Sequence, residues 1–332
     1  MLKKRLLLTL MFVLVLMYLS VGQLAAQQIL GIGTGSTGGT VYPVGCSIAS
    51  IANEEISDYN FSASSSGGSA ENLEMLRNNE MAMGLIGAVP SGNAYYGKKQ
   101  YEGKAIKNIR SVTALHPEVV ELVYRKNTGI KTLKDFIGKK IAVGPPGGGG
   151  SLYCPDIFET LGGFTFNDIN AEYIGQDDSV QAMQDRLIDA TYLGSGYPTS
   201  SVTQLYASSL EVGMIEFTDE ELAKMKKVMP AYSRIVVPAG TYPKQEKDLN
   251  LIGFKSSLVT REDIDEKAVY ELLEVMYVKR FKDLQARHKA LSQISLEEAL
   301  KGLVTPLHVG AVKFYRDQGI EIPEDLIPPE MK

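Results

Sequence analysis

Short apolar runs typical of β-strands alternate along this sequence with segments that have the periodicity of amphipathic helices. The run QILGIG (28–33) precedes apolar residues at positions 41, 44, 48, 51 and 52, which share one face of a helix. The alternation continues through the strand-like runs YNFSAS (59–64), MAMGLIG (81–87), KKIAVG (139–144), AEYIG (171–175) and ATYLG (190–194). Strands that alternate with helices predict βαβ units, parallel sheets and an α/β fold.

The last third of the chain is expected to be mostly helical. Two capping boxes, Thr218 with Glu221 and Ser295 with Glu298, predict helix starts in this part of the sequence. No repeat and no Pro- or Ser-rich linker interrupts the chain, so ordered crossovers are expected to join any two domains.

The first residues have the three-part pattern of a secretory signal peptide. Lys3, Lys4 and Arg5 precede an apolar run from Leu6 to about Leu19, and small residues follow at Ala25 and Ala26. The alternative is a membrane anchor, but the run is slightly short for the ~20 residues of a transmembrane helix. We expect residues 1–26 to be a cleaved signal peptide and the product to be a soluble periplasmic protein.

The amino-acid composition bears on the size of the domains and on the kind of molecule that the protein can bind. The chain has 332 residues, 44% of them hydrophobic and 22% charged, with a formal net charge of −5. Residues 27–332 are enough for two domains of ~150 residues each. Without a basic excess, nucleic acid is not expected as a partner. The three histidines lie far apart, and the two cysteines, Cys46 and Cys154, cannot form a metal site, so neither a metal nor another cofactor is expected. We predict that both cysteines are free thiols on opposite sides of a cleft.

Three loops rich in glycine and hydroxyl residues each follow a predicted strand and precede a predicted helix. They are GTGSTGG (33–39), SSSGGS (64–69) and GPPGGGGS (144–151). Glycines leave backbone N–H groups uncovered at a helix N-terminus, where the macrodipole is positive, and the hydroxyls add donors without charge. The three loops together predict a cradle for an anion, most simply a carboxylate. For any single loop, the alternative is a tight βα turn that needs glycine for steric reasons.

The residues around these loops argue against nucleotide binding and against a serine nucleophile. The stretch Gly33–Gly38 matches G-x-G-x-x-G, but the second strand ends in FSASSSGGS, without the acidic residue that a dinucleotide site requires. No lysine completes a phosphate-binding P-loop, and Thr34 stands where a nucleophile elbow needs glycine before Ser36. Neither nucleotide binding nor serine hydrolase chemistry is therefore expected.

The chain resembles the TAXI family of extracytoplasmic solute receptors of TRAP transporters over nearly all of residues 27–332. The resemblance rests on the order and spacing of six segments: IGTGSTGGTVYPVG (32–45), SSGGSAENLEML (65–76), GIKTLKDFIGKKIAVGPPGGGG (129–150), RLIDATYLGSGYPTSS (186–201), VVPAGTYPKQ (236–245) and PLHVGAVKFYRDQG (306–319).

The resemblance implies a type II-like periplasmic-binding-protein fold with two α/β lobes and a ligand cleft between them. The first lobe would comprise residues 27–123 and 236–332, and the second lobe residues 124–235. Such a receptor, expected to be a monomer and not an enzyme, captures a small carboxylate and delivers it to a TRAP membrane permease. Glutamate and 2-oxoglutarate are the ligands that the resemblance suggests.

The resemblance also implies a set of ligand-binding residues. In the first lobe these are Thr34, Gly35, Ser36, Thr37, Gly38, Tyr42, Ser66 and Ser69, and in the second lobe Gly147, Gly148, Gly149, Gly150, Ser151 and Ser195. No catalytic and no metal-ligating residue is expected. His116 is expected to be a hydrogen-bonded residue of a loop or crossover. Gln176, Asp177 and Asp178 are expected to cap a helix that starts near Ser179.

Two other functions remain open from the sequence. A periplasmic enzyme on the same fold would need a positioned base with a nucleophile, or a metal, and no such constellation is visible. A sensor subunit that presents its ligand-bound form to a signalling receptor has no sequence feature that separates it from a transport receptor.

Overall fold

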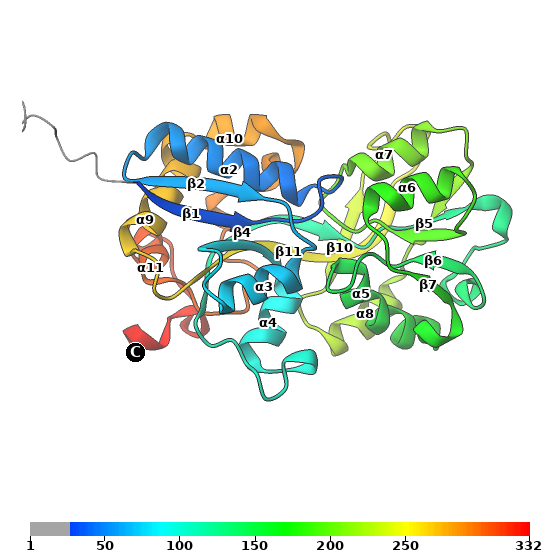
Figure 1. The fold of residues 1–332 in the computed structure, drawn as a ribbon, viewed down its shortest axis with the longest axis horizontal. Coiled ribbons are helices and arrows are strands. Elements are labelled where there is room, and N and C mark those ends of the chain that lie inside the picture. Colours follow the sequence, from blue (N-terminus) through cyan, green and yellow to red (C-terminus); the bar gives the residue numbers. More distant parts are fainter. Residues whose placement is uncertain (1–26) are drawn as a thin grey trace, which may run out of the picture.

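The computed structural model describes residues 27–332, so the predicted signal peptide lies outside the described part of the chain. Two β-sheets form the centres of two lobes, which lie side by side in Figure 1. The first sheet has the order β10-β11-β3-β1-β2, and β4 also pairs with β11. Its strands are β1 (Gln28–Gly33), β2 (Tyr59–Ser64), β3 (Met83–Gly87), β4 (Ile109–Val119), β10 (Ser233–Val237) and β11 (Leu249–Arg261).

The second sheet has the order β7-β6-β8-β5-β9. Its strands are β5 (Leu122–Arg125), β6 (Lys140–Ala142), β7 (Asn170–Glu172), β8 (Ala190–Tyr192) and β9 (Val212–Met214). The predicted lobe boundaries at 123/124 and 235/236 fall inside strands β5 and β10, and the division of the chain into lobes at those residues stays a proposal.

Helices cover both faces of each sheet because each buries one apolar stripe. In the first lobe, α2 (Val41–Glu55), α9 (Glu266–Glu274), α10 (Phe281–Arg287) and α11 (Val309–Asp317) share one hydrophobic core, whereas α3 (Ser69–Arg77) and α4 (Ala88–Tyr96) share another. In the second lobe, α5 (Gly149–Ile157) and α8 (Asp219–Val228) pack in one core, and α6 (Gln176–Gln184) and α7 (Ser200–Ala207) in the other. This layering confirms the predicted α/β class.

The prediction of parallel sheets is correct only in part. Strand β1 runs parallel to β2 and β3, and β6 runs parallel to β7 and β8, as βαβ units require. By contrast, β11 is antiparallel to β3, β4 and β10, and β5 is antiparallel to β8 and β9. The sheets are mixed because β5 and β11, which lie next to the crossovers between the lobes, run antiparallel to the strands of the βαβ units.

The C-terminal third departs from the expected mostly helical structure, since it contains the 13-residue strand β11. Of the two predicted capping boxes, the first is confirmed: Thr218 Oγ1 accepts a hydrogen bond from Glu221 N at 3.2 Å at the start of α8. The second is wrong, because Ser295 makes no side-chain capping bond and precedes only a three-residue 3₁₀ turn, Leu296–Glu298.

Strand β11 contributes to the cores of both lobes. Leu251 and Phe254, in its first half, pack in the second-lobe cores, and Leu258, in its second half, packs in the core beneath α2. Figure 1 shows β4, β10 and β11 running through the middle of the molecule, between the two sets of helices. In residues 27–332, no helix has the length and apolar character needed to span a membrane.

Candidate functional site

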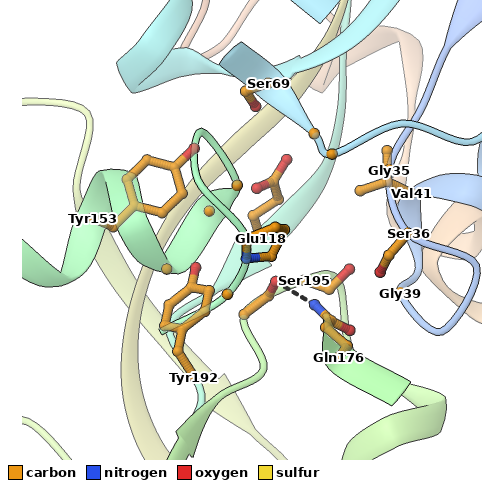
Figure 2. A pocket seen from close by; sticks show the side chains of 18 of the residues that line it. Gly35, Ser36, Gly39, Val41, Ser69, Glu118, Tyr153, Gln176, Tyr192 and Ser195 are labelled. Carbon is orange, nitrogen blue, oxygen red and sulfur yellow. Dashed lines mark hydrogen bonds between the residues drawn. The ribbon is translucent and has the colours of Figure 1, made fainter. Parts of the chain in front are cut away.

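A cavity of about 80 Å³ lies between the two lobes. A single water needs only ~10–15 Å³ of such volume, so the cavity has room for a small organic molecule and no more. Both lobes contribute to its wall (Figure 2). The lining residues are Thr34, Gly35, Ser36, Gly39, Val41, Gly67, Gly68, Ser69, Leu85, Glu118, Gly144, Pro145, Gly148, Gly149, Gly150, Tyr153, Gln176, Tyr192, Gly194 and Ser195.

The first glycine-rich loop joins β1 to α2 and reaches the cavity through its backbone. Thr34 Oγ1 donates to Ser64 O at 2.6 Å, so its hydroxyl is committed to holding the loop against β2. A turn is closed where Gly39 N donates to Ser36 O at 3.1 Å. The hydroxyl of Ser36 has no partner among residues 27–332 and remains available to a ligand.

The second loop turns into α3 at Gly68, which precedes the first helical residue. Gly68 has φ 107° and ψ −154°, a conformation that is open essentially to glycine alone. Ser66 does not line the cavity, because its hydroxyl donates to Asn72 Oδ1 at 2.7 Å and accepts from Gly68 N at 3.1 Å. Ser69 lies in the lining and accepts a hydrogen bond from Gly87 N at 3.1 Å.

The third loop joins β6 to α5 and is held so tightly that one position excludes any side chain. A Cβ atom on Gly150 would lie 2.2 Å from the carbonyl oxygen of Val143. Ser151 faces away from the cavity and donates to Pro145 O and Gly148 O, both at 2.9 Å. Glycine here therefore allows the first turn of α5 to approach both β6 and the cavity.

Four helix N-termini meet at the cavity. The lining includes the first residues of α2, α3, α5 and α6, namely Val41, Ser69, Gly149 and Gln176. The first-turn N–H groups of a helix have no partner within the helix, and the helix dipole gives this end a partial positive charge. The two lobes together therefore present an environment that favours negative charge on a ligand, although no lysine, arginine or histidine is in the lining.

Of the fourteen residues expected to bind the ligand, eight line this cavity: Thr34, Gly35, Ser36, Ser69, Gly148, Gly149, Gly150 and Ser195. The other six, Thr37, Gly38, Tyr42, Ser66, Gly147 and Ser151, lie outside the lining. Tyr42 is in the first turn of α2, beside Cys46, and the remaining five hold loops together or bridge the lobes.

Four polar side chains in the lining were missed: Glu118, Tyr153, Gln176 and Tyr192. Glu118 is at the end of β4, Tyr153 is on α5 and Tyr192 ends β8, and no local pattern marks any of them. Gln176 follows β7, a position that could have indicated it, but the expectation that residues 176–178 cap a helix near Ser179 is wrong. Helix α6 begins at Gln176 itself, after Gly175.

Two of these side chains carry buried polar atoms without a partner. Tyr153 is 1% exposed, and its hydroxyl has no hydrogen bond among residues 27–332. The same holds for the buried amide oxygen of Gln176, whose amide nitrogen donates to Gly194 O at 3.3 Å. Buried polar atoms normally have partners, so these two indicate that the cavity is built to hold a polar molecule.

Hydrogen bonds and an ion pair join the lobes around the cavity. On one side, Thr40 N donates to Ser195 Oγ at 2.9 Å and Ser200 Oγ donates to Gly38 O at 2.6 Å. Thr37 Oγ1 donates to Asp177 Oδ2 at 3.3 Å on the same side. On the other side, Ala70 N donates to Gly147 O at 3.4 Å, and Lys99 pairs with Asp156. The described conformation is therefore the closed one.

Burial shifts the pKa of an acid and of a histidine near the cavity. Burial raises the pKa of Glu118 to about 7. Burial lowers the pKa of His116 to about 3, with smaller contributions from the charges of His288 and Lys255. The expectation of a hydrogen-bonded loop residue is wrong for His116, because it lies inside strand β4 and neither ring nitrogen has a partner within residues 27–332.

The cysteines and possible metal ligands lie apart from this site. Cys46 is half-buried on α2 in the first lobe and Cys154 is buried on α5 in the second lobe, and both are free thiols. In the described part of the chain, no group of three or more His, Cys, Asp or Glu side chains is arranged to hold a metal ion.

Three solved structures align with most of this chain and share little sequence with it. A protein of Bordetella bronchiseptica RB50 superposes with a TM-score of 0.52 at 16% identity, over 92% of this chain and 86% of the other. PhnD1 from Prochlorococcus marinus (MIT 9301), in complex with methylphosphonate, gives a TM-score of 0.50 at 12% identity, over 80% of this chain and 88% of the other. The periplasmic aliphatic sulphonate binding protein SsuA from Escherichia coli gives a TM-score of 0.45 at 16% identity, over 91% and 96% of the two chains.

Two α/β lobes with a polar cavity between them form the bilobed fold of periplasmic binding proteins. The sequence profile of one family matches residues 32–319, which include both lobes and every residue of the cavity lining. The chain belongs to the NMT1-like family.

Proposed function

We propose that this protein is a solute receptor of the TAXI type. It captures a small carboxylate, such as glutamate or 2-oxoglutarate, in the periplasm and delivers it to a TRAP membrane permease. It acts as a monomer and is not an enzyme. The observation that carries this proposal is a closed cavity between two lobes, at which four helix N-termini meet. Such a site holds an anion by neutral donors, without a side-chain cation.

Ligand contacts can be assigned to the hydrogen-bond donors of the lining that have no partner within the protein. Ser36 has an unpartnered hydroxyl in the lining, as does Tyr153. Ser195 accepts from Thr40 N, so its own proton is free to be donated into the cavity. We propose these three hydroxyls and the backbone N–H groups of Gly148–Gly150 as the donors to the ligand. Thr37, Gly38 and Gly147 instead contribute to closure of the lobes.

The arrangement favours binding over catalysis. A nucleophile is activated by a base within hydrogen-bonding reach, usually 2.6–3.2 Å. Among residues 27–332, neither ring nitrogen of His116 has a hydrogen-bond partner, and the only hydroxyl paired with Glu118, that of Ser256, lies outside the cavity lining. The lining therefore lacks the pairing that acyl-transfer chemistry needs.

The ligand class is tested by thermal unfolding of residues 27–332. The protein is first unfolded and refolded to remove any ligand that co-purifies with it, and native mass spectrometry checks that none remains. A carboxylate at 100 times its dissociation constant should stabilise the protein by ~2.7 kcal/mol, a rise of a few degrees in Tm. A library of mono- and dicarboxylates that leaves Tm unchanged would overturn the carboxylate assignment.

The transporter class is tested in proteoliposomes that contain a TRAP permease from the same organism. Uptake of the identified ligand should require both this protein and an ion gradient across the membrane. Uptake that instead depends on ATP and an ABC-type permease would leave the receptor function standing and overturn the assignment to TRAP transport.

A further inference from the structure

Glu118 is the only charged side chain among the described residues that line the cavity. It is next to the last residue of β4, where the chain is about to pass from the first lobe to the second. Figure 2 shows its carboxyl group in the midst of the lining side chains. Among residues 27–332 this carboxyl group forms no ion pair. The Ser256 hydroxyl lies beside it and favours its charged form, but this effect on the pKa of Glu118 is smaller than the effect of burial.

Glu118 is half-buried, and a carboxyl group that is partly removed from water without a cation beside it is costly to keep charged. Nothing in the cavity neutralises it, because the lining contains no lysine, arginine or histidine. Figure 2 shows Ser69 and Tyr153 in the lining around Glu118, and the hydroxyl of Tyr153 is unpartnered. A cationic group on a ligand in the cavity would supply the positive charge that the lining lacks.

The rest of the lining attracts the opposite charge. Four helix N-termini and uncommitted hydroxyls favour a negative group on the ligand, whereas Glu118 favours a positive one. We propose that Glu118 is the residue that determines specificity, and that the ligand is a small zwitterion, an α-amino acid, whose ammonium group binds Glu118 while its carboxylate binds the glycine-rich loops. This inference rests on the proposed function and selects between the two classes of ligand named there.

An alternative role for Glu118 predicts the opposite dependence of ligand affinity on pH. Burial raises the pKa of Glu118 to about 7, so a protonated Glu118 could instead donate a hydrogen bond to a second carboxylate of a 2-oxo acid. Binding of an ammonium group lowers the pKa of Glu118 and releases a proton, so affinity rises with pH between 6 and 8. Binding of a carboxylate to protonated Glu118 takes up a proton, so affinity falls over the same range.

Tyr153, Tyr192 and His116, which lie near Glu118, do not change charge between pH 6 and 8. Tyr153 and Tyr192 face it from α5 and β8, and burial raises the pKa of each well above 10. His116, on the same strand, has a pKa of about 3, and burial also lowers the pKa of His288. Asp177 lies at the rim beside Gly38, and Lys255 lies on the neighbouring strand β11. Glu121 is the exception, with a pKa of about 8, but it lies outside the lining and serves as a control.

Calorimetry with pairs of ligands that differ only at the amino group tests the proposal. The probes are L-glutamate with 2-oxoglutarate, L-alanine with pyruvate, and L-leucine with 4-methyl-2-oxopentanoate, at pH 6, 7 and 8 in two buffers of different ionisation enthalpy. We expect an amino acid to bind at least about tenfold more tightly than its 2-oxo acid, because a charge-assisted bond is lost in the latter. Affinity for the amino acid should rise with pH as protons are released.

Two matched variants separate the role of Glu118 from that of buried acids in general. In Glu118→Gln, affinity for the amino acid should fall at least about tenfold and the proton release should vanish. In Glu121→Gln, affinity should change less than about twofold. An unchanged Tm of the ligand-free Glu118→Gln protein, or a higher one, shows that the variant is folded.

The outcomes distinguish this inference from the proposed function. Equal or tighter binding of a 2-oxo acid by the wild type, with proton uptake, overturns the role of Glu118 and leaves a carboxylate receptor. Unaltered amino acid binding by Glu118→Gln also overturns it. If no compound of either class binds, both the zwitterion and the proposed carboxylate receptor are overturned.

Discussion

The hydroxyl of Ser200, in the first turn of α7, donates a 2.6 Å hydrogen bond to the carbonyl oxygen of Gly38 in the opposite lobe. Ser201 Oγ donates to the same oxygen at 3.2 Å. Gly38 is in the loop that resembles a dinucleotide fingerprint, but its carbonyl is used to hold the lobes together. Two residues of the same loop thus have different roles. Ser36 lines the cavity, and Gly38 accepts a hydrogen bond that joins the two lobes.

The first prediction concerns this contact. Ser200→Ala removes a hydrogen bond that exists only in the closed conformation and does not touch the cavity. A net loss of about 0.5–1.5 kcal/mol would raise the ligand dissociation rate about two- to tenfold and leave the association rate nearly unchanged. Stopped-flow fluorescence with the identified ligand measures both rates.

The matched control is Ser208→Ala, whose hydroxyl donates to Leu205 O at 2.7 Å within the second lobe. This variant should keep wild-type rates, although its stability falls. Equal changes in both variants would mean that the Ser200 bond has no special role in closure.

The second prediction separates two neighbouring hydroxyls. Ser36 lines the cavity and has no partner in the described residues, whereas Thr37 is exposed and donates to Asp177 at 3.3 Å. Ser36→Ala should weaken binding by ~1.5–3 kcal/mol, through loss of a hydrogen bond to a charged group. Thr37→Val, which keeps the shape of the side chain, should weaken it by less than ~1 kcal/mol. Isothermal titration calorimetry provides the comparison, and a larger effect at Thr37 would contradict the assignment.

The third prediction concerns Glu121, a buried acid in the short crossover between β4 and β5. Tyr242 Oη donates to its carboxyl group at 2.5 Å and Thr199 Oγ1 at 2.7 Å. Burial raises its pKa to about 8 from the ordinary 4.5, and these two hydrogen bonds oppose the shift. Between pH 4.5 and 8 the folded protein therefore holds a proton that the unfolded chain has released. The free energy of unfolding should consequently fall as pH rises through this range.

Glu121→Gln removes that titration. Its unfolding free energy, measured by urea denaturation from pH 5 to 8, should decline less steeply than that of the wild type. Some slope should remain, because Glu118 titrates in the same range with a pKa of about 7. Parallel curves for the two proteins would show that Glu121 keeps an ordinary pKa in the folded state.

The fourth prediction distinguishes the two thiols. Cys154 is fully buried, and burial raises the pKa of its thiol, so it should resist alkylation while the protein is folded. Cys46 is only half-buried and should react first. Intact-mass analysis without reductant should show two labels on the denatured protein, and Cys46→Ser should remove the label that appears in the native state. A denatured protein that takes up label only after reduction would instead contain a disulfide.

The parts of the site that could be predicted are those fixed by local backbone chemistry. The loops that begin after β1, β2 and β6 were recognisable because glycine and hydroxyl residues mark the passage from a strand into a helix. These loops were expected to form one cradle, the third loop coming from the other lobe, and all three contribute to the cavity lining. Within a loop, however, sequence does not show which hydroxyl faces inward: Ser66 and Ser151 bond to their own loops, whereas Ser36 does not.

The unpredicted parts depend on contacts between distant segments. Glu118 reaches the cavity because β4 pairs antiparallel with β11, more than 130 positions later, a pairing that the alternation of strands and helices does not indicate. Tyr153 and Tyr192 follow the same patterns as core tyrosines, and only the packing of the lobes turns them toward the cavity. The helical expectation for the last third failed at β11 for a related reason, since two of its three partner strands, β3 and β4, precede it by more than 130 positions.

Because β11 contributes to both lobes, it determines how much of the chain must be synthesised before either lobe can fold. Leu251 and Phe254 fill cores of the second lobe, and α9 and α11 complete the core of the first. A growing chain that ends before Ser233 lacks part of each core, whatever its length up to that point. Neither lobe can complete its core until the last hundred or so residues have been synthesised, so an unfinished chain leaves apolar surface of both lobes uncovered.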